Sequence, residues 1–264
     1  MALFQKKTHT IGLDIGSSSV KLAELEQDSK DGIWHLRNFG VASLPPEAIV
    51  DGAVMNTNAV VDAIRQLISK HRVKTKDAVV SISGNSVIIK RISLPVMTVD
   101  ELEESIQWEA EQYIPFDIND VNIDVQILSE EGDEAGQMEV LLVAAKRDVM
   151  QQYQAAVRDA GLNAVIVDAA ALPLQNAVEG GVGFVAGETV AIINVGASFS
   201  TMSIVSDGRP HFNRDIGAGG NTYTEAIQRQ LAVPIDGAEA YKVGGAIAAM
   251  GAAADVVPQE VHTI

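Results

Sequence analysis

Alternation of apolar and polar residues predicts a strand, a turn and a second strand at the start of the chain. Thr10–Asp14 is rich in apolar residues, Gly16–Ser19 is polar, and Val20–Leu25 alternates with a period of two. Three further elements are expected to complete this first core. They are a strand, an amphipathic helix and a buried strand: Ile33–Ser43, about Asn58–His71, and Asp77–Ser83.

A second group of elements begins with Val87–Leu94, which predicts a strand that ends at Pro95. Thr98 and Glu101 have the spacing of a capping box, in which two side chains accept hydrogen bonds from the free amides at the start of a helix. This helix is expected to end before Pro115. Two strands and a helix follow: Val121–Leu128, Met138–Ala145 and Val149–Ala160. The whole order predicts an inserted α+β module.

The last part of the chain repeats the order of elements with which the chain opens. A strand at Ala164–Asp168 and a helix at about Ala169–Val178 lead to a candidate domain boundary at Gly180–Gly187. Strands, a turn and a glycine segment that opens a helix come next: Thr189–Val195, Gly196–Ser198, Thr201–Val205, Arg209–Asn213, Gly217–Gly220 and about Thr222–Leu231. We therefore predict a duplicated α/β fold. Residues 1–86 with 164–186 form its first domain, 87–163 the inserted module, and 187–264 the second domain.

Composition excludes several classes of function. The chain has 264 residues and a formal net charge of −16, which argues against a nucleic-acid partner because phosphate neutralisation needs clustered lysine and arginine. It contains no cysteine, which excludes disulfides and thiolate metal sites. The polar segment Met1–Thr10 lacks the apolar core of an export signal. A cytoplasmic location is therefore expected.

Two turns rich in glycine and serine are the candidate phosphate-binding elements. One such turn alone is weak evidence for a binding site, because glycine and serine are the usual residues of hairpins. Here Asn194–Ser200 occupies the same place between two strands as the first turn, so amides and hydroxyls can hold a triphosphate from both sides. Asp14 is a candidate ligand of Mg²⁺ through water, and Lys21 is either a phosphate ligand or a solvated strand residue. The candidate phosphate-binding residues within the turns are Gly16, Ser17, Ser18, Ser19, Gly196, Ala197 and Ser198.

With these turns the chain resembles the actin-like ATPase superfamily, which includes actin, sugar kinases, MreB and FtsA. The resemblance implies a ribonuclease H-like duplicated α/β fold with ATP and Mg²⁺ as cofactors. Asp168 stands where relatives carry a residue that orients the hydrolytic water, and Gly219 and Gly220 stand in the glycine segment after the second phosphate loop. Asn194 takes the place of the usual aspartate. Water-mediated Mg²⁺ contacts at Asp14 and Asn194, with slow hydrolysis at most, are the expectation.

Three segments are more specifically similar to the PilM family, cytoplasmic actin-like proteins of type IV pilus assembly: Arg91–Pro95, Glu109–Phe116 and Leu141–Lys146. In that family the inserted module is subdomain 1C, and a groove between subdomains 1A and 1C captures the N-terminal cytoplasmic tail of PilN. Tyr113, Ile114 and Phe116 would line this groove, although such residues are more often core. The resemblance also implies other inner-membrane pilus proteins and assembly ATPases as partners, peripheral attachment to the inner membrane, and a role in twitching motility. Self-association is left open.

Relatives continue beyond the C-terminus of this chain with an adenosine motif and a closing helix, and Gly244–Ala254 lacks the strand and helix that would place it under a base. The second domain, subdomain 2A and the start of 2B, is therefore expected to be truncated. Two other functions stay open. An FtsA-like membrane-associated filament protein would need an amphipathic C-terminal helix, for which Val256–Ile264 is short and acidic. A small-molecule kinase would need a carboxylate base, for which Asp77 is the nearest candidate.

Overall fold

The computed structural model describes residues 10–28, 32–130 and 136–243 of the chain. The expectations for Gly244–Ala254 and Val256–Ile264 lie outside the described residues. Most strands and helices that the sequence predicts are present within one or two residues of their expected bounds. The α/β character of the chain is therefore confirmed.

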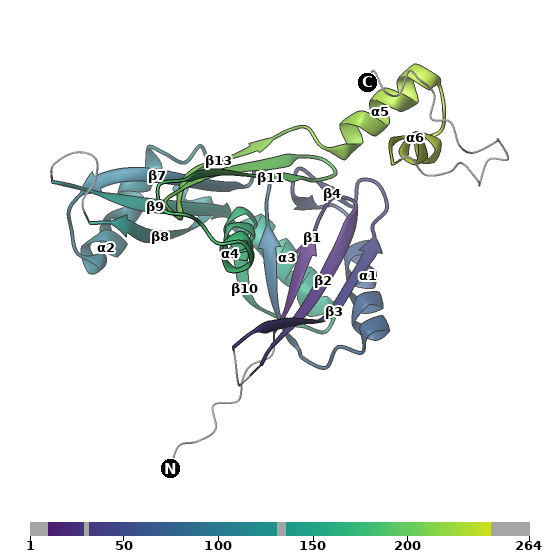
Figure 1. Ribbon diagram of the computed structural model, residues 1–264, viewed down its shortest axis with the longest axis horizontal. Coiled ribbons are helices and arrows are strands. Elements are labelled where there is room, and N and C mark those ends of the chain that lie inside the picture. The colour runs from purple at the N-terminus through teal and green to yellow at the C-terminus, as the bar shows by residue number, and fades with distance from the viewer. Residues whose placement is uncertain (1–9, 29–31, 131–135, 244–264) are drawn as a thin grey trace, which may run out of the picture. The chain divides into compact units, whose positions relative to one another are not determined.

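One five-stranded sheet carries the opening strands of the chain (Figure 1). Its strands are β1 (Thr10–Ile15), β2 (Ser19–Gln27), β3 (Trp34–Ser43), β6 (Asp77–Ile82) and β10 (Asn163–Ala169), in the spatial order β10-β6-β1-β2-β3. β1 is antiparallel to β2, which confirms the predicted hairpin, and both β1 and β10 are parallel to β6. The carboxyl ends of β1, β6 and β10 consequently meet at one edge of the sheet.

Two helices cover one face of this sheet. α1 (Thr57–His71) begins after Asn56, whose side chain accepts a hydrogen bond from the Ala59 amide at 3.0 Å. α3 (Arg147–Asp159) buries Tyr153 and Val157 in the same core as Leu13 of β1. Alternate residues of β1 point to the other face, where they are exposed. Polar side chains of β1 can therefore gather on that face.

The packing of α3 differs from the sequence-based grouping, which places this helix in the inserted module at 87–163. Its buried residues Val149, Tyr153 and Ala156 belong to the core of the five-stranded sheet. The helical pattern of apolar residues reveals which face is buried, but it does not reveal which sheet covers that face.

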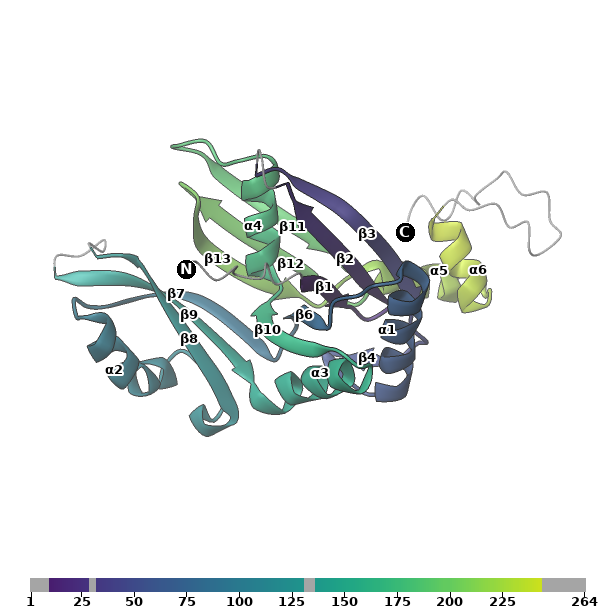
Figure 2. The same ribbon diagram turned by 90° about the horizontal axis from the view of Figure 1, so that it is seen from below.

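The inserted module has a sheet and a core of its own (Figure 2). β7 (Val87–Pro95), β9 (Gln137–Lys146) and β8 (Val121–Ser129) form an antiparallel sheet in that order, and α2 (Val99–Glu111) covers one face. The predicted capping box is confirmed, because the Thr98 amide donates to the Glu101 carboxylate at 2.8 Å and the Glu101 amide donates to Thr98 Oγ1 at 3.3 Å. The bond from the Thr98 amide, with a second one that the Thr98 hydroxyl donates to the same carboxylate at 2.9 Å, holds the pKa of Glu101 below its usual value. A short 3₁₀ turn, η1 (Ile118–Asp120), precedes β8.

The sequence patterns missed four short elements, of which η1 is one. β4 (Ile49–Val50) and β5 (Ala53–Val54) form a small hairpin whose turn residues Asp51 and Gly52 have φ angles of 50° and 82°. Strands of two residues are too short to show a period. α6 (Ile235–Lys242) was also not predicted, because Gly237 interrupts its short apolar pattern.

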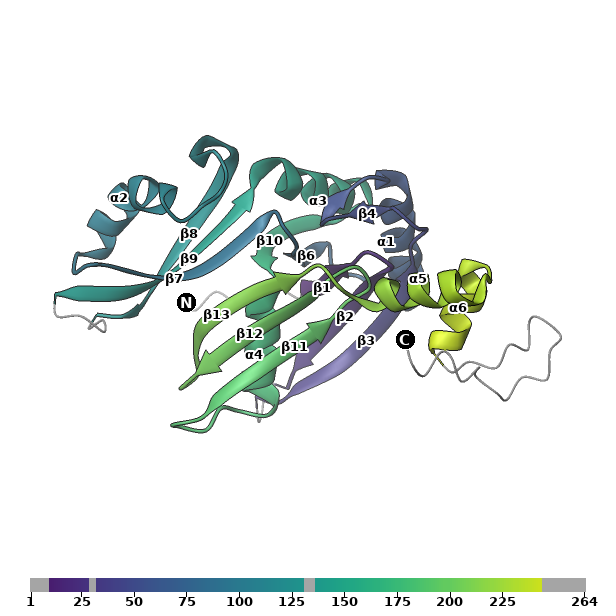
Figure 3. The same cartoon turned by 90° about the horizontal axis from the view of Figure 1, so that it is seen from above.

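The chain continues after β10 through α4 (Ala171–Gly181) into a sheet of β11 (Thr189–Val195), β12 (Ser200–Ser206) and β13 (Arg209–Ile216). α5 (Gly220–Leu231) and α6 then lie side by side (Figure 3). The chain divides into two compact units, Met1–Ile192 with Met202–Arg214, and Ile193–Thr201 with Asp215–Ile264. In the described part of the chain, no helix has both the length and the apolar character that a bilayer crossing requires.

Candidate functional site

The first glycine and serine turn closes the β1–β2 hairpin. The Gly16 amide donates to the Ser19 carbonyl at 3.0 Å, and the Leu44 amide donates to the Ser18 carbonyl at 2.8 Å. Within residues 10–28, 32–130 and 136–243, the amides of Ser17 and Ser18 have no hydrogen-bond partner. The carbonyl side of the turn is thus used inside the protein, and its N–H side offers two donors of the kind that an oxyanion needs.

Strand register aligns three polar side chains beside this turn. Asp14 on β1 lies opposite Ser81 on β6, and Ser81 lies opposite Asp168 on β10. All three occupy the sheet face that points away from α1 and α3. Adjacent strands are about 4.8 Å apart, so the Cα atoms of Asp14 and Asp168 are separated by about 10 Å. The candidate Mg²⁺ ligand and the candidate water-orienting residue therefore share one edge of the sheet.

Lys21 lies directly across the hairpin from Asp14. Its Nζ is 2.7 Å from Asp14 Oδ2, and the two side chains are 45% and 52% exposed. Lys21 is therefore a strand residue that is held by an ion pair beside the turn. An exposed pair of this kind contributes at most about 1 kcal/mol to stability, so its value for the fold is small.

Acidic charge surrounds this edge. Burial raises the pKa of Asp168 above its ordinary value, a hydrogen bond from the Ala169 amide at 2.8 Å opposes the rise, and the Asp124 carboxylate adds to it. Burial also raises the pKa of Tyr153, and the charge of Asp14 raises it further. Each of these carboxylates would be stabilised by a nearby cation.

The residues at this edge fit the phosphates of a nucleotide. Among the described residues the amides of Ser17 and Ser18 have no hydrogen-bond partner, Lys21 is a cation beside them, and Asp14 carries a carboxylate of the kind that suits Mg²⁺. A Cβ at Gly16 would lie 3.4 Å from the Ser19 carbonyl oxygen and 3.8 Å from Lys21 Nζ. The described residues contain no group of three or more His, Asp or Glu side chains that could hold a metal ion by themselves.

The second glycine and serine turn closes the β11–β12 hairpin, in the second compact unit. The Gly196 amide donates to the Phe199 carbonyl at 3.0 Å, which repeats the bond that closes the first turn. The amides of Gly220 and Asn221 donate to the carbonyls of Gly196 and Ala197 at 2.9 and 2.7 Å. The start of α5 is thus bonded to the turn, and its first amides are occupied.

Close backbone approach explains the glycines at this contact. A Cβ at Gly219 would lie 2.6 Å from the Ala197 carbonyl oxygen, which is closer than real Cβ atoms come. The structure brings together the predicted residues of both segments: Gly196, Ala197, Ser198, Gly219 and Gly220. In the part of the chain that the structure describes, the amides of Ala197 and Ser198 have no partner. Asn194 precedes the turn and is exposed on β11.

Lys242 fixes the start of α5 from below the turn. Its Nζ lies 2.6 Å from the Glu239 carboxylate and donates to Thr224 Oγ1 at 2.9 Å and to the Gly220 carbonyl at 3.2 Å. Burial pushes the pKa of Glu239 up, but the bonds from Lys242 and Thr224 and the charge of Lys242 outweigh burial and lower it. No sequence motif pointed to this network, because its members come from two helices.

The three candidate groove residues have different surroundings. Ile114 is 6% exposed and belongs to the core of the inserted module, while Tyr113 and Phe116 are partly buried against that core. The Phe116 ring lies 4.4 Å from Lys146 Nζ, and the Tyr113 carbonyl accepts a hydrogen bond from Lys90 at 3.0 Å. Only Tyr113 and Phe116 of the three retain surface for a partner.

Two residues change the sequence-based picture of the chemistry. Asp77, the candidate kinase base, begins β6 and pairs in register with Thr10, so it lies at the opposite end of the strand from Ser81. About four residues at 3.3 Å each separate them, roughly 13 Å. Ser81 was not predicted as a site residue. Its place in the period-two pattern of a buried strand indicates which face of the sheet it occupies. This places Ser81 beside Asp14 and Asp168 only once the parallel register is known.

The family model described as type IV pilus assembly protein PilM matches residues 12–253. The cell division protein FtsA of Neisseria meningitidis serogroup B is 24% identical in an alignment that covers 90% of this chain and 62% of FtsA. This chain therefore spans less than two thirds of the length of that relative.

The chain is also similar to solved structures. A PilM-PilN type IV pilus biogenesis complex matches with a TM-score of 0.80 and 28% identity, covering 89% of this chain and 69% of that chain. The ethanolamine utilization protein EutJ from Carboxydothermus hydrogenoformans matches with a TM-score of 0.50 and 14% identity, covering 90% and 62% of the two chains. This second match bears on the fold alone, and the expected actin-like fold is confirmed. Because the family model covers nearly the whole sequence, the chain belongs to the PilM family of type IV pilus assembly proteins.

Proposed function

We propose that this chain is a nucleotide-binding scaffold of type IV pilus assembly that docks on the N-terminal cytoplasmic tail of PilN. The observation that carries the proposal is the match, with a TM-score of 0.80, to a PilM-PilN complex. In this role the chain works in the cytoplasm and is held at the inner membrane by its partners. Other inner-membrane pilus proteins and assembly ATPases would join the same complex and support twitching motility.

The proposed groove for the tail uses the partly buried aromatic residues of the inserted module. Tyr113 and Phe116 follow α2 and rest on a core that includes Ile114, which gives their rings a rigid support. Lys146 over the Phe116 ring adds a cation beside the apolar surface. A short extended peptide binds to such a surface by placing apolar side chains against the rings.

Fluorescence anisotropy with a labelled peptide of the PilN tail tests this docking. Phe116→Ala is expected to weaken binding by about tenfold or more, because buried aromatic contacts dominate small interfaces. Trp108→Ala is the matched control, since Trp108 is an aromatic residue of α2 that is 80% exposed and lies outside the proposed groove. Equal losses in both variants, or no loss in either, would contradict the proposed groove.

We further propose that ATP with Mg²⁺ binds at the first turn and that its hydrolysis is at most slow. Asp14, Ser81 and Asp168 share the sheet edge beside the unpaired amides of the turn, which supports phosphate and metal binding there. Asn194, an amide in place of a carboxylate, cannot polarise water as strongly. ATP would influence the tail only if the two ligands favour the same state of the protein. A tail affinity that is identical with and without ATP would show that nucleotide binding does not influence tail binding.

A further inference from the structure

The end of α1 and the segment that joins it to β6 carry a row of exposed cations. Lys70, Arg72, Lys74 and Lys76 are all exposed, and no acidic residue occurs at positions 63–76. In the described part of the chain, none of these four side chains forms an ion pair or a hydrogen bond. The formal net charge of the whole chain is −16, so the charge of this segment is opposite in sign to that of the molecule.

The backbone of this segment is fixed at both ends. Arg72 ends α1 with a φ of 51°, and the Val73 amide donates to the Ile68 carbonyl at 3.1 Å. The Lys76 carbonyl accepts from the Asn163 amide at 2.6 Å. Val73 packs against the core of the five-stranded sheet, while the basic residues at alternate positions are exposed. Alternate residues of an extended chain lie about 6.6 Å apart on one side, so the cations form a row that faces away from the core.

The dipole of α1 accounts for only part of this charge. Lys70 lies in the last turn, where a cation stabilises the negative end of a helix. Lys74 and Lys76 lie beyond the helix, and the effect of the dipole falls off within one turn. Lys76 is followed by Asp77, which begins β6 at the end opposite to Ser81 and the proposed nucleotide site. The proposed nucleotide site and tail groove use neither lysine.

Exposed apolar side chains lie at the same end of the sheet. Asp77 at the start of β6 pairs with Thr10 at the start of β1. β2 runs antiparallel to β1, so its end lies here too, and Gln27 at that end pairs with Trp34 at the start of β3. Ile33 and Trp34 are both more than half exposed, and β3 is three strands from β6, about 14 Å across the sheet. Figure 1 shows the last turn of α1 and the β2–β3 hairpin both at this end.

Positive charge outweighs negative charge at this end. The described charged residues at these strand ends and at positions 70–76 are Lys70, Arg72, Lys74, Lys76, Arg37, Glu26, Asp28 and Asp77. Glu26 forms an ion pair with Arg37 at 3.4 Å, and Asp77 accepts a hydrogen bond from the Asn163 side chain at 3.1 Å. Much of the acidic charge lies elsewhere, since α2 of the inserted module alone has six acidic residues and no basic one. Because charges farther away than about 8 Å are largely screened at physiological ionic strength, an approaching surface meets a net positive end.

We propose that this end of the first compact unit contacts an anionic phospholipid surface, with the row of cations on the headgroup phosphates and Trp34 at the lipid–water interface. Lysine and arginine are attracted to anionic lipids, and tryptophan is enriched at membrane interfaces. A protein partner would need an apolar centre among the cations, but Val73 is turned to the core. Four cations bind weakly, so the contact acts as a second signal beside the PilN tail. The choice of a lipid surface rests on the proposed location at the inner membrane.

Co-sedimentation with vesicles tests this contact, with phosphatidylglycerol in a zwitterionic lipid as the anionic probe. The unaltered protein should bind these vesicles more tightly than purely zwitterionic ones, and added salt should weaken binding because it screens the charges. Each cation near an anionic surface strengthens binding about fivefold, so Lys74→Gln/Lys76→Gln should bind roughly twentyfold more weakly. Its melting temperature should not change, because both side chains are exposed and, among the described residues, unpaired.

Arg209→Gln/Arg229→Gln is the matched control, because it removes the same charge from two exposed positions on β13 and α5. This variant should bind the anionic vesicles like the unaltered protein. Equal weakening in the two double variants would reduce the contact to net charge and overturn the proposal. So would the absence of binding to anionic vesicles at low salt.

Tryptophan fluorescence tests the place of the contact. The chain has two tryptophans, Trp34 and Trp108, so Trp108→Phe leaves Trp34 as the only one. Its emission should shift to shorter wavelength on anionic vesicles, because the indole ring leaves water. Trp34→Phe, which keeps Trp108 on α2, should show no shift. A shift in Trp34→Phe that is missing in Trp108→Phe would place the contact on α2 and overturn the proposal.

Two further measurements separate the lipid contact from other partners. Without vesicles, Lys74→Gln/Lys76→Gln should bind the PilN tail peptide as tightly as the unaltered protein. A failure of tail binding in both proteins, with vesicle binding retained, would contradict the tail docking and still support the lipid contact. A labelled DNA duplex is the probe for nucleic acid. Duplex binding that is tighter than vesicle binding and depends on the same lysines would overturn the lipid assignment.

Discussion

The two glycine and serine turns have the same closing hydrogen bond but are supported differently. The first turn stands at the edge of a sheet beside the Asp14–Lys21 ion pair, and its carbonyl at Ser18 is held by Leu44. The second turn gives two carbonyls to the start of α5, which approaches so closely that Gly219 has no room for a side chain. The similar sequences thus indicate similar turns. The neighbouring elements decide whether a glycine is needed for close packing of the backbone or for the approach of a ligand.

Gly219→Ala should have the largest effect on this comparison. The added Cβ would meet the carbonyl oxygens of Ala197 and Gly196 at 2.6 and 2.7 Å, so the turn and α5 must separate. A loss of about 1–3 kcal/mol in the free energy of unfolding is expected, measured by urea denaturation. Gly217→Ala is the control, because nothing lies within 4 Å of its Cβ position. Equal stability of the two variants would show that the close approach is not required.

Asp14→Ala should have the next largest effect, on the ligand rather than on the fold. We expect the affinity for Mg²⁺·ATP to fall by about tenfold, equivalent to about 1.4 kcal/mol, while the melting temperature changes little because the ion pair with Lys21 is exposed. Calorimetric titration measures the first quantity and thermal melting the second. Asp77→Ala, at the far end of β6, should keep the affinity. Undiminished affinity in Asp14→Ala would place the phosphates elsewhere.

Gly16→Ala should separate packing from ligand approach at the first turn. Its Cβ would lie at an ordinary distance of 3.4 Å from the nearest carbonyl oxygen, so stability should change by less than about 1 kcal/mol. The methyl group would nevertheless stand where phosphate approaches, and nucleotide affinity should fall. A variant as unstable as Gly219→Ala would mean that both turns use glycine for packing. Paired measurements of unfolding and nucleotide binding decide between the two outcomes.

Asp168→Asn should have the smallest effect, and its sign depends on pH. The pKa of Asp168 is raised in the folded protein, so the folded state favours the protonated form and loses stability as pH rises from the ordinary value through the raised one. The variant should therefore melt slightly higher than the unaltered protein at neutral pH. Below the ordinary pKa of an aspartate the difference should vanish. A variant that melts lower at neutral pH would contradict the raised pKa.

The elements of the fold were largely predictable because each long strand and helix carries its own period. The capping box at Thr98 and Glu101 is local, and so is the turn at Gly16–Ser19. The partner of an element is not local. The apolar pattern of α3 does not indicate which sheet the helix covers. The identity of Ile114 likewise does not indicate whether its side chain lines a groove or lies in a core.

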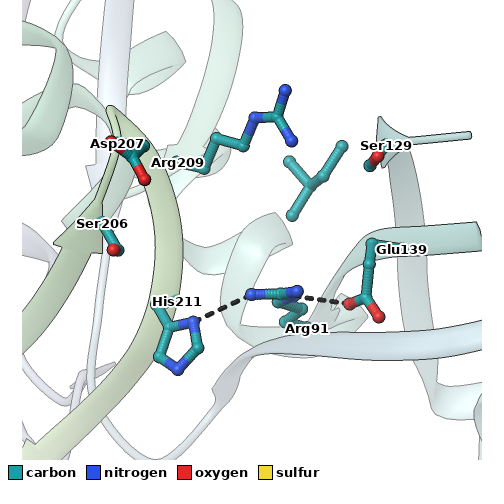
Figure 4. A pocket seen from close by; sticks show the side chains of 8 residues that line it. Arg91, Ser129, Glu139, Ser206, Asp207, Arg209 and His211 are labelled. Atoms are coloured by element: carbon teal, nitrogen blue, oxygen red, sulfur yellow. Dashed lines mark hydrogen bonds and ion pairs between the residues drawn. The ribbon is translucent and has the colours of Figure 1, made fainter. Parts of the chain in front are cut away.

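The site was predictable only in part for the same reason. Sequence patterns singled out Asp14 and Asp168, but their common edge depends on the register through Ser81. The role of Asn221, whose amide holds the Ala197 carbonyl, also depends on a contact between distant segments. A cavity lined by Arg91 of β7 and Arg209 of β13 (Figure 4) combines residues of two different sheets, so no motif of adjacent residues reveals it.

The ion pair at the first turn has a consequence for selectivity. With Lys21 at 2.7 Å, Asp14 already has a counter-ion, and a free divalent cation would have to displace the ammonium group without offering it another partner. A cation that arrives together with phosphates brings that partner, because the displaced ammonium group can turn toward a phosphate oxygen. Lys21 would thereby act as an internal competitor that excludes bare metal ions and admits the metal complex of a nucleotide.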